Sequence, residues 1–579
     1  MRYSLKRVTS EGASLVTQKT FPPSRAPQFR FADTLEEQER QLASNPLMQR
    51  MDAARRAKAD DPWRPLYHYV NPENTLNDPN GLCFWQGRWH LFYQAVPPEE
   101  TRQHWGHAVS EDLVHWRDLP YALHPGPEDR CYSGTALVEE ERVVAIYHGV
   151  RYGNMVATAR DPLLLNWEKL PDNPVIPFAG ADEAPPPYGV FDPCIWSSDG
   201  AYYALAGGII PGQREARYSA TDYLFRSRDL VDWEYLHPFI EGDRFTVPGD
   251  DGACPYFWPI GDRHILLFFS HMSGGQYWLG DYDRQRQKFV VDAHGRCNFG
   301  ATFPAGVHAP TAAPDGEGGV IVMFNMNPGK PTYRMNDYLG DFFGDQGGGG
   351  TDDDPGQAGR HWDQILTLPR RLTLRNPHEL TIEPAGDIEA LRHDHRHIGP
   401  GVLPANQELL LEDIRGNAIE LQITFDPKLA SMVEVDVLRS PQREECTRIC
   451  FFNKRGFRYR EPHADDPHAH RVMSTMLSNP VRHESIITID TSLSSTLPDA
   501  LSRPPESAPV FIEPGEPLRL RIFVDRSIVE VFVNDRQCLA LRVYPGRADS
   551  TGVSLLSRGQ DAELLALDCW QMRSVYDPA

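Results

Sequence analysis

One acidic residue stands inside a stretch of sequence that is typical of a turn. Residues 76–81 read LNDPNG, and Asp78 lies in their middle, directly before the strand-like run LCFWQGRWHLFYQ. A turn accounts for this composition, because Asn and Asp bond to their own backbone and Pro presets φ. The alternative is a catalytic carboxylate that points into a pocket from the end of a strand. On these six residues alone, the turn is the simpler interpretation.

Strand signals dominate the chain around Asp78, from about residue 65 to about residue 370. Five aromatic and β-branched runs each follow a turn, namely GRWHLFYQ, ERVVAIYHG, GAYYALAGG, DRHILLFFSH and GGVIVMFNM. They recur roughly every 50 to 60 residues, which is room for one four-stranded blade each. This spacing predicts a five-bladed β-propeller.

Three further segments share an acidic residue, a Leu and a Trp, namely SEDLVHWRDL, ARDPLLLNWEKL and SRDLVDWEYL. We interpret them as an internal repeat, with one copy per blade. Each Trp is expected to fill the core rather than to stack on a sugar.

The two ends of the chain show different patterns. Residues 34–59 form the main helical stretch, with Leu35, Leu42, Leu47 and Met51 at roughly helical spacing, and Pro46 is expected to divide it. From about residue 385 the sequence alternates apolar and polar residues, which predicts a β-sandwich. The predicted fold class is therefore all-β. It comprises an N-terminal helical extension (1–61), a five-bladed propeller (62–375) and a β-sandwich (385–579).

Composition and charge restrict the classes of partner. The 579 residues include 58 Lys and Arg against 80 Asp and Glu, a net charge of −22. This balance disfavours nucleic acid or an anionic membrane and suits a soluble protein with a small neutral ligand. We find no transmembrane segment, and the N-terminus lacks the continuous apolar stretch of a secretory signal.

The cysteines and the acidic loop give no metal site. Of nine cysteines, only Cys446 and Cys450 lie close together, and no second pair completes a zinc site. Buried thiols in a reducing compartment are expected, which indicates the cytoplasm. The acidic stretch 340–360 contains three consecutive aspartates, but their spacing matches no calcium loop, so a solvated loop is expected. We expect no metal and no cofactor.

Several motifs occur together in an order that resembles glycoside hydrolase family 32, the invertases, levanases, inulinases and fructosyltransferases. They are LNDPNG, HWGHAVSEDLVHW, CYSGTALV, FDP, CP, LTLPRRLTL and LRIFVDRSIVEVFVND. The resemblance extends from about residue 66 to the C-terminus. It implies a five-bladed propeller with a pocket on its axis, a C-terminal β-sandwich, and hydrolysis or transfer of β-fructofuranosyl groups with retention of configuration.

The resemblance also implies roles for individual residues. Retention needs two carboxylates about 5 Å apart, one that attacks C2 and one that protonates the departing oxygen. By resemblance, Asp78 is the nucleophile and Asp192 of FDP the transition-state stabiliser. The residues expected to line the sugar pocket are Asn77, Gln94, Trp105, Tyr132, Ser133 and Phe191. In this context Asp78 is better interpreted as a nucleophile than as a turn residue.

The sequence departs from the family pattern around the same pocket. The acid/base Glu before Cys-Pro is Ala253, the Arg before Asp-Pro is Phe191, and the acidic residue after Cys-Pro is Tyr256. An engineered change could explain Ala253 alone, whereas several departures together favour natural divergence. Because a methyl group donates no proton, another donor is needed. Asp251 is the leading substitute; Asp250, Tyr256 and His271 are the other candidates.

Three functions remain open at this point. The first is a retaining glycosidase or transglycosylase acting on β-fructofuranosides or fructose-containing oligosaccharides. The second is a glycosidase for another furanoside, such as an arabinofuranoside, because Phe191 removes a polar contact. The third is a carbohydrate-binding pseudoenzyme or an inactivated variant, for which Ala253 is the main reason.

Overall fold

The computed structural model describes residues 21–178, 188–207, 222–247, 250–330, 362–454 and 485–576. This part of the chain is nearly all β-structure, with two α-helices, α1 (Leu35–Ala43) and α2 (Pro46–Ala57), and a 3₁₀ turn at Ile388–Leu391. The chain divides into two compact units. The first comprises residues 1–297, 307–388 and 575–579, and the second comprises residues 298–306 and 389–574. The acidic stretch 340–360 lies outside the described residues.

The first unit contains five largely antiparallel sheets among its described residues. The first sheet comprises β1 (Leu76–Trp85), β2 (Arg88–Ala95), β3 (His104–Ser110) and β4 (Arg117–Leu123). The second comprises β5 (Cys131–Val138), β6 (Val143–Gly149), β7 (Gly153–Ala159), β8 (Glu168–Lys169) and β9 (Ile176–Pro177). The third comprises β10 (Pro193–Ser198), β11 (Ala201–Ala206), β12 (Tyr223–Ser227) and β13 (Trp233–Pro238).

The fourth sheet comprises β15 (Ala253–Ile260), β16 (Arg263–Ser270), β17 (Gly274–Asp283), β18 (Lys288–Arg296) and, paired in parallel with β18, the short β14 (Ile240–Glu241). The fifth comprises β19 (Val307–Pro314), β20 (Val320–Met326), β21 (Ile365–Leu366), β22 (Arg370–Asn376) and β23 (Glu379–Pro384).

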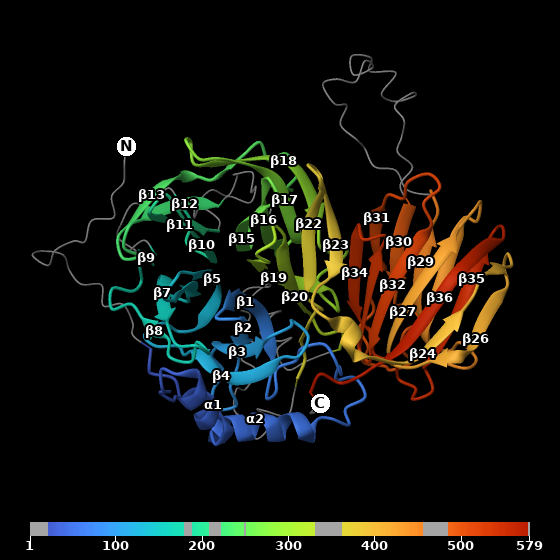
Figure 1. Ribbon diagram of the computed structural model, residues 1–579, viewed down its shortest axis with the longest axis horizontal. Coiled ribbons are helices and arrows are strands. Elements are labelled where there is room, and N and C mark those ends of the chain that lie inside the picture. The colour runs from blue at the N-terminus through green and yellow to red at the C-terminus, as the bar shows by residue number, and fades with distance from the viewer. Residues whose placement is uncertain are drawn as a thin grey trace, which may run out of the picture. The chain divides into compact units, whose positions relative to one another are not determined.

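The strands β1, β5, β10, β15 and β19 form a closed cycle. Each contacts the next, and β19 contacts β1 again. Apart from the short strands β9, β14 and β21, the other strands of each sheet follow outward in chain order, so the five sheets surround a common centre (Figure 1). Side chains that leave the ends of these five strands therefore converge.

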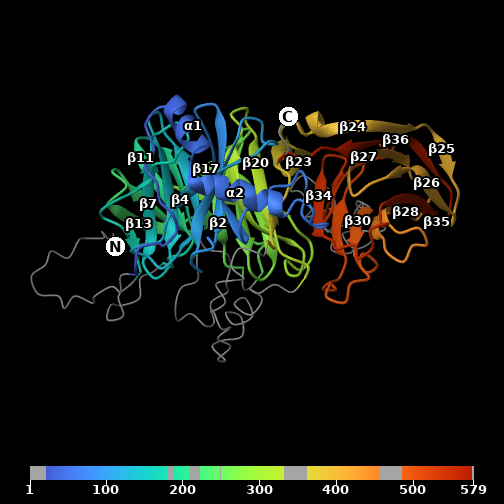
Figure 2. The ribbon, with the colours of Figure 1, turned by 90° about the horizontal axis from the view of Figure 1, so that it is seen from below.

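The predicted helical stretch is confirmed, including its division at Pro46. Pro46 is the first residue of α2, a position where the missing N–H is not needed. The Asn45 side chain caps this helix by accepting from the Leu47 N–H at 2.9 Å. Leu47 and Met51 are buried in the core of the first sheet, against which α2 packs through β4 (Figure 2). The helices are thus held by apolar contacts with the sheets.

The repeated Trp segments occupy equivalent loops. The indole N–H of Trp116 donates to the Leu113 carbonyl at 3.0 Å, and that of Trp233 donates to the Leu230 carbonyl at 3.0 Å. Both of these Trp side chains are buried. Trp167, in the remaining copy ARDPLLLNWEKL, is partly buried and packs against a hydrophobic core. Their expected role as core residues is confirmed.

The second unit consists of two sheets that enclose one hydrophobic core. One comprises β24 (Arg392–Ile398), β25 (Gly401–Leu403), β27 (Ala418–Asp426), β32 (Leu518–Asp525), β33 (Ile528–Val533), β34 (Gln537–Arg542) and β36 (Ala562–Met572). The other comprises β26 (Glu408–Arg415), β28 (Met432–Arg439), β29 (Thr447–Phe452), β30 (Ser485–Asp490), β31 (Glu506–Val510) and β35 (Gly552–Arg558). This is the arrangement of a β-sandwich.

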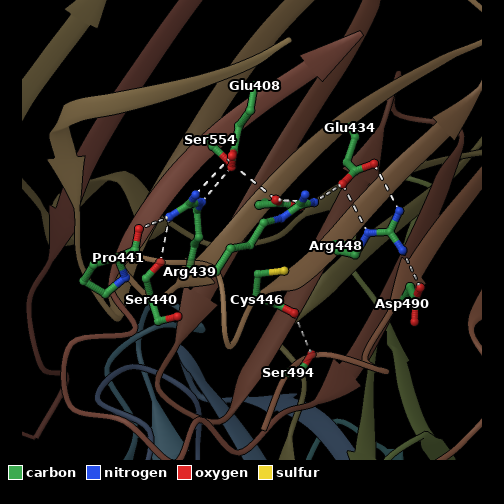
Figure 3. Close-up of polar contacts among 12 residues, drawn as sticks. Glu408, Glu434, Arg439, Ser440, Pro441, Cys446, Arg448, Asp490, Ser494 and Ser554 are labelled. Carbon is green, nitrogen blue, oxygen red and sulfur yellow. Dashed lines mark hydrogen bonds and ion pairs between the residues drawn. The ribbon is translucent and has the colours of Figure 1, made fainter. Parts of the chain in front are cut away.

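Strand β28 shows why the two sheets face each other. Val433, Val435 and Val437 alternate into the core, as the period of two along a strand requires. Glu434 and Asp436 lie between them on the other face, where the Arg448 guanidinium bridges Glu434 and Asp490 (Figure 3). Apolar burial and ionic pairing therefore occupy opposite faces of one strand.

The cysteines are mostly buried, as predicted. Eight of the nine are buried and Cys297 is partly buried; within the described residues none forms a disulfide. The expected reducing, cytoplasmic location stays a prediction. No helix in the described ranges is long and apolar enough to cross a membrane.

Candidate active site

Irregularities in the central strands direct side chains into a shared site. The pairing register shifts at residues 76–79 in β1, 131–134 in β5, 253–256 in β15 and 307–310 in β19. An extra residue in one strand of a pair bends that strand and changes where its side chains point. These four segments carry Asp78, Ser133, Cys254 and His308, and Asp192 directly precedes β10.

Asp78 is held through one of its two oxygens. Its Oδ2 accepts from the Ser133 hydroxyl at 2.7 Å and from Gln94 Nε2 at 3.1 Å. Its Oδ1 is buried and makes no hydrogen bond within the described residues. His308 Nε2 lies 3.7 Å from that oxygen, beyond hydrogen-bond distance. One carboxylate oxygen is therefore fixed, and the other is buried without a hydrogen-bond partner among the described residues.

Cys254 connects Asp78 to a second carboxylate, Asp192. Its backbone N–H donates to Asp192 Oδ2 at 3.1 Å. Its sulfur lies 3.4 Å from the same Asp192 oxygen and 3.9 Å from Asp78 Oδ2. Cys254 has a positive φ of 48°, a conformation that few non-Gly residues adopt, at the register shift of β15. The two carboxylates predicted from distant motifs thus lie around one thiol.

Burial raises the pKa of both carboxyls. For Asp192, burial is the larger cause and the charge of Asp78 the second, and together they raise its pKa to about 7. Burial also raises the pKa of Asp78, against the opposing hydrogen bond from Ser133. The pair therefore exchanges protons at a higher pH than ordinary aspartates do.

An amide network extends the site from Asp78. Asn77 Nδ2 donates to Gln94 Oε1 at 3.1 Å, and Gln364 Nε2 donates to Asn77 Oδ1 at 3.1 Å. Gln94 Nε2 also lies 2.9 Å from the Ser133 hydroxyl. The structure therefore brings Asn77, Gln94 and Ser133 together with Asp78, as the sequence predicts.

The three aromatic residues expected in the pocket differ in exposure. Tyr132 and Phe191 are partly exposed, and the Phe191 ring lies 5.3 Å from that of His148. Trp105, in contrast, has no exposed surface, and its indole N–H donates to the Tyr132 carbonyl at 2.9 Å. Trp105 is therefore a core residue, because β3 is the third strand outward from the centre in its sheet.

The position of the family acid/base is apolar. Ala253 is fully buried and packs with Cys254, Phe269 and Ala309, against the partly buried Phe191. This cluster contains no group that could donate a proton to a sugar oxygen, apart from the Cys254 thiol beside the carboxylates.

Two of the candidate substitute donors have structural roles. Asp250 is buried and accepts from the Ser273 hydroxyl and from the Val247 N–H. The Tyr256 hydroxyl accepts from the Gly81 N–H at 3.2 Å and lies 3.1 Å from the Gly134 carbonyl. Tyr256 therefore joins β1, β5 and β15 at the centre of the ring.

Asp251 and His271 form a pair close to the carboxylates. Asp251 Oδ2 lies 2.6 Å from His271 Nδ1, and Asp251 Oδ1 accepts the His271 N–H at 3.1 Å. The His271 side chain is 37% exposed, and that of Asp251 is 16% exposed. They remain as donor candidates after Asp250 and Tyr256 are set aside.

Sequence reasoning missed Cys254 and His308. Cys254 follows Ala253 in a motif that was interpreted only through its missing Glu. His308 lies in no motif at all, and its ring lies 4.1 Å from that of Phe269. Only the register shift of β19 and the closed ring of strands bring it to Asp78. Within the described ranges, no group of three His, Cys, Asp or Glu side chains could hold a metal ion.

Comparisons with known proteins agree in one family. Residues 68–325 match the sequence model of the glycosyl hydrolases family 32 N-terminal domain. Residues 387–571 match that of the glycosyl hydrolases family 32 C-terminal domain. Together the two matches cover more than half of the chain.

Similar proteins cover most of the chain. A raffinose invertase of Escherichia coli is 28% identical over 553 residues, which are 89% of this chain and 96% of that protein. A sucrose-6-phosphate hydrolase of Escherichia coli is 27% identical over 86% of this chain and 94% of its own length. The crystal structure of fructan 1-exohydrolase IIa from Cichorium intybus superposes with a TM-score of 0.70 at 22% identity, covering 89% and 98% of the two chains.

Proposed function

Because the chain belongs to glycoside hydrolase family 32, we propose that it is a retaining glycosidase of the β-fructofuranosidase type, which acts on β-fructofuranosides or fructose-containing oligosaccharides. The relatives named as invertase and sucrose-6-phosphate hydrolase support this activity over that of an arabinofuranosidase or a pseudoenzyme. Its substrate is a small carbohydrate. The five sheets of the first unit are the blades of a five-bladed propeller, which the closed cycle of central strands supports.

Asp78 is the nucleophile of the proposed reaction. The observation that carries this role is the buried Oδ1, which accepts no hydrogen bond from the described residues, while Ser133 and Gln94 hold Oδ2. Such a carboxylate is oriented for attack on C2 without prior loss of a hydrogen bond. The attack forms a covalent fructosyl–enzyme ester, which water then hydrolyses.

Asp192 stabilises the transition state. Its Oδ2 is held by the Cys254 N–H, and the carboxylate faces the same centre as Asp78. Negative charge there favours the positive charge that develops on the fructosyl ring. Asn77, Gln94 and Ser133 bind the sugar, with Tyr132 and Phe191 at its edge.

The test is Asp78→Asn, assayed on sucrose. The amide keeps the size of the side chain but is no nucleophile, so kcat/KM should fall by roughly 10⁴-fold or more. Asp232→Asn is the matched control, because Asp232 is an exposed carboxylate of the same unit. Thermal unfolding of both variants should match that of the parent to within a few degrees. Sucrose turnover by Asp78→Asn at the parent rate would refute the proposal.

A further inference from the structure

Asp251 and His271 lie opposite each other across the strand pair that carries Ala253. In the antiparallel pairing of β15 with β16, Ala253 is the partner of Phe269. Asp251 lies two residues before Ala253, outside β15, and His271 directly follows β16; the hydrogen bonds between Asp251 and His271 hold these two strand ends together.

The hydrogen bonds of His271 leave one ring nitrogen available. Nδ1 lies 2.6 Å from the Asp251 carboxylate, which as an anion can only accept, so Nδ1 carries a proton. Nε2 makes no hydrogen bond within the described residues. The backbone N–H of His271 also donates to Asp251, so the carboxylate fixes both the backbone and the ring. Nε2 can therefore carry a second proton and release it.

The surroundings of His271 connect it to the nucleophile. Its ring centre lies 6.1 Å from that of His308, whose Nε2 lies 3.7 Å from Asp78 Oδ1. Phe269 packs between them, with its ring centre 5.2 Å from His271 and 4.1 Å from His308. Unlike the fully buried Ala253, the His271 side chain is partly exposed. The leaving group of a substrate must extend toward solvent, and His271 is partly exposed to solvent.

The charged groups around His271 favour its protonated form. Burial alone would lower the pKa of His271, but the hydrogen bond and charge of Asp251 outweigh it. The charges of Asp78 and Asp192 act in the same direction, so the pKa of His271 lies above its ordinary value. His308 differs, since burial and the charge of His271 lower its pKa to about 3. His308 is neutral near pH 7 and cannot serve as the acid.

We propose that His271, positioned by Asp251, is the general acid/base that replaces the missing family glutamate. This inference rests on the proposed function. As Asp78 bonds to C2, the bond from C2 to the leaving oxygen breaks, and His271 Nε2–H transfers its proton to that oxygen. The leaving alcohol departs and a neutral imidazole remains, with Nδ1–H still bonded to Asp251. This imidazole then takes a proton from the water that attacks C2, which releases the sugar and the Asp78 carboxylate.

The test is His271→Gln, assayed on sucrose and on p-nitrophenyl β-fructofuranoside. The sugar alkoxide leaving sucrose needs a proton, so kcat/KM on sucrose should fall by about 10²–10⁴-fold. The nitrophenolate leaves without one, so its release should change less than about 3-fold. His115→Gln is the matched control, because His115 Nδ1 pairs with Asp112 at 2.7 Å in a loop away from the site. It should leave both rates unchanged.

Asp251→Asn gives an independent measurement with a distinct signature. Without the Asp251 charge, the pKa of His271 falls, so the alkaline limb of kcat/KM on sucrose should move to lower pH. Equal losses on both substrates in His271→Gln, no loss on sucrose, or an unmoved alkaline limb in Asp251→Asn would each overturn the acid/base role. A parent protein that hydrolyses neither fructoside would instead overturn the proposed function.

Discussion

Each unit of the molecule buries a pair of carboxylates, and the two pairs differ in their counter-charges. In the first unit Asp78 and Asp192 lie around the Cys254 thiol, with His271 as the nearby group that can carry positive charge. In the second unit Glu434 and Asp436 lie on one face of β28 and are bonded to arginines. Arg443 lies 2.6 Å from Glu434 and 2.8 Å from Asp436.

The arginines change how the second pair ionises. Arg448 makes two further bonds to Glu434 and one to Asp490 (Figure 3). Although burial opposes it, the bonds from Arg448 lower the pKa of Glu434, whereas burial and the charge of Glu434 raise the pKa of Asp436. One carboxyl of the pair is thus held ionised.

The pair of the first unit behaves differently, because burial raises the pKa of both Asp78 and Asp192. The position before Asp192, an Arg in the family pattern, is Phe191. The comparison indicates that direct bonds from arginines engage the oxygens of the second pair and hold Glu434 ionised. Without them the carboxylates remain available to a substrate that carries developing positive charge.

Among the changes that test this comparison of the two pairs, the largest effect is expected when Asp192 loses its charge. Asp192→Asn should lower kcat/KM on sucrose by about 10²–10³-fold, because it removes electrostatic stabilisation of the transition state. A raised pKa means that the folded protein loses stability as pH rises from 3.8 to about 7. The Asn variant has no carboxyl to ionise at this position, so it does not lose this stability. The free energy of unfolding of the variant minus that of the parent should therefore increase as pH rises over that range. Urea unfolding at pH 4 and pH 8 measures this, and an unchanged difference would count against the raised pKa.

The same change in the second unit should affect stability instead. Glu434→Gln weakens the bonds to two arginines and should reduce the free energy of unfolding by about 2 kcal/mol. Activity on sucrose per folded molecule should stay within about 2-fold of the parent. Glu412→Gln, on the exposed part of β26, is the control and should change neither quantity. A large loss of activity in Glu434→Gln would remove the distinction between the two pairs.

A smaller effect should follow from giving the first pair an arginine. Phe191→Arg places a guanidinium next to Asp192 and should lower the pKa values of the pair. Because Asp78 must be ionised to attack, activity is lost as pH falls through these values. The acid limb of kcat/KM should therefore move to lower pH, by about one unit. Phe191→Leu is the control for lost packing against His148, and it should leave the acid limb where it is.

Parts of the fold follow from local sequence patterns alone. The period of apolar residues predicts the helices at 34–59, and Pro46 predicts their division, because its ring and missing N–H act on the nearest turn. The alternation of Val433, Val435 and Val437 likewise predicts a strand with one apolar face. The Trp repeat predicts buried Trp116 and Trp233. All these features depend on neighbours within a few residues in the chain.

The candidate site shows what sequence could not supply. Motifs single out Asp78 and Asp192, but only the ring of strands places both beside Cys254. Trp105 was expected to line the sugar pocket, yet it is buried, because β3 lies two strands outward from the central strand β1.

Sequence by itself determined the strand-rich architecture, the family resemblance and the absence of Glu at position 253. The tertiary structure decided that Asp251 pairs with His271 and that His308 Nε2 lies 3.7 Å from Asp78 Oδ1. The physical reason is that these contacts depend on pairing register and burial between segments distant in the chain, and no local pattern encodes either of them.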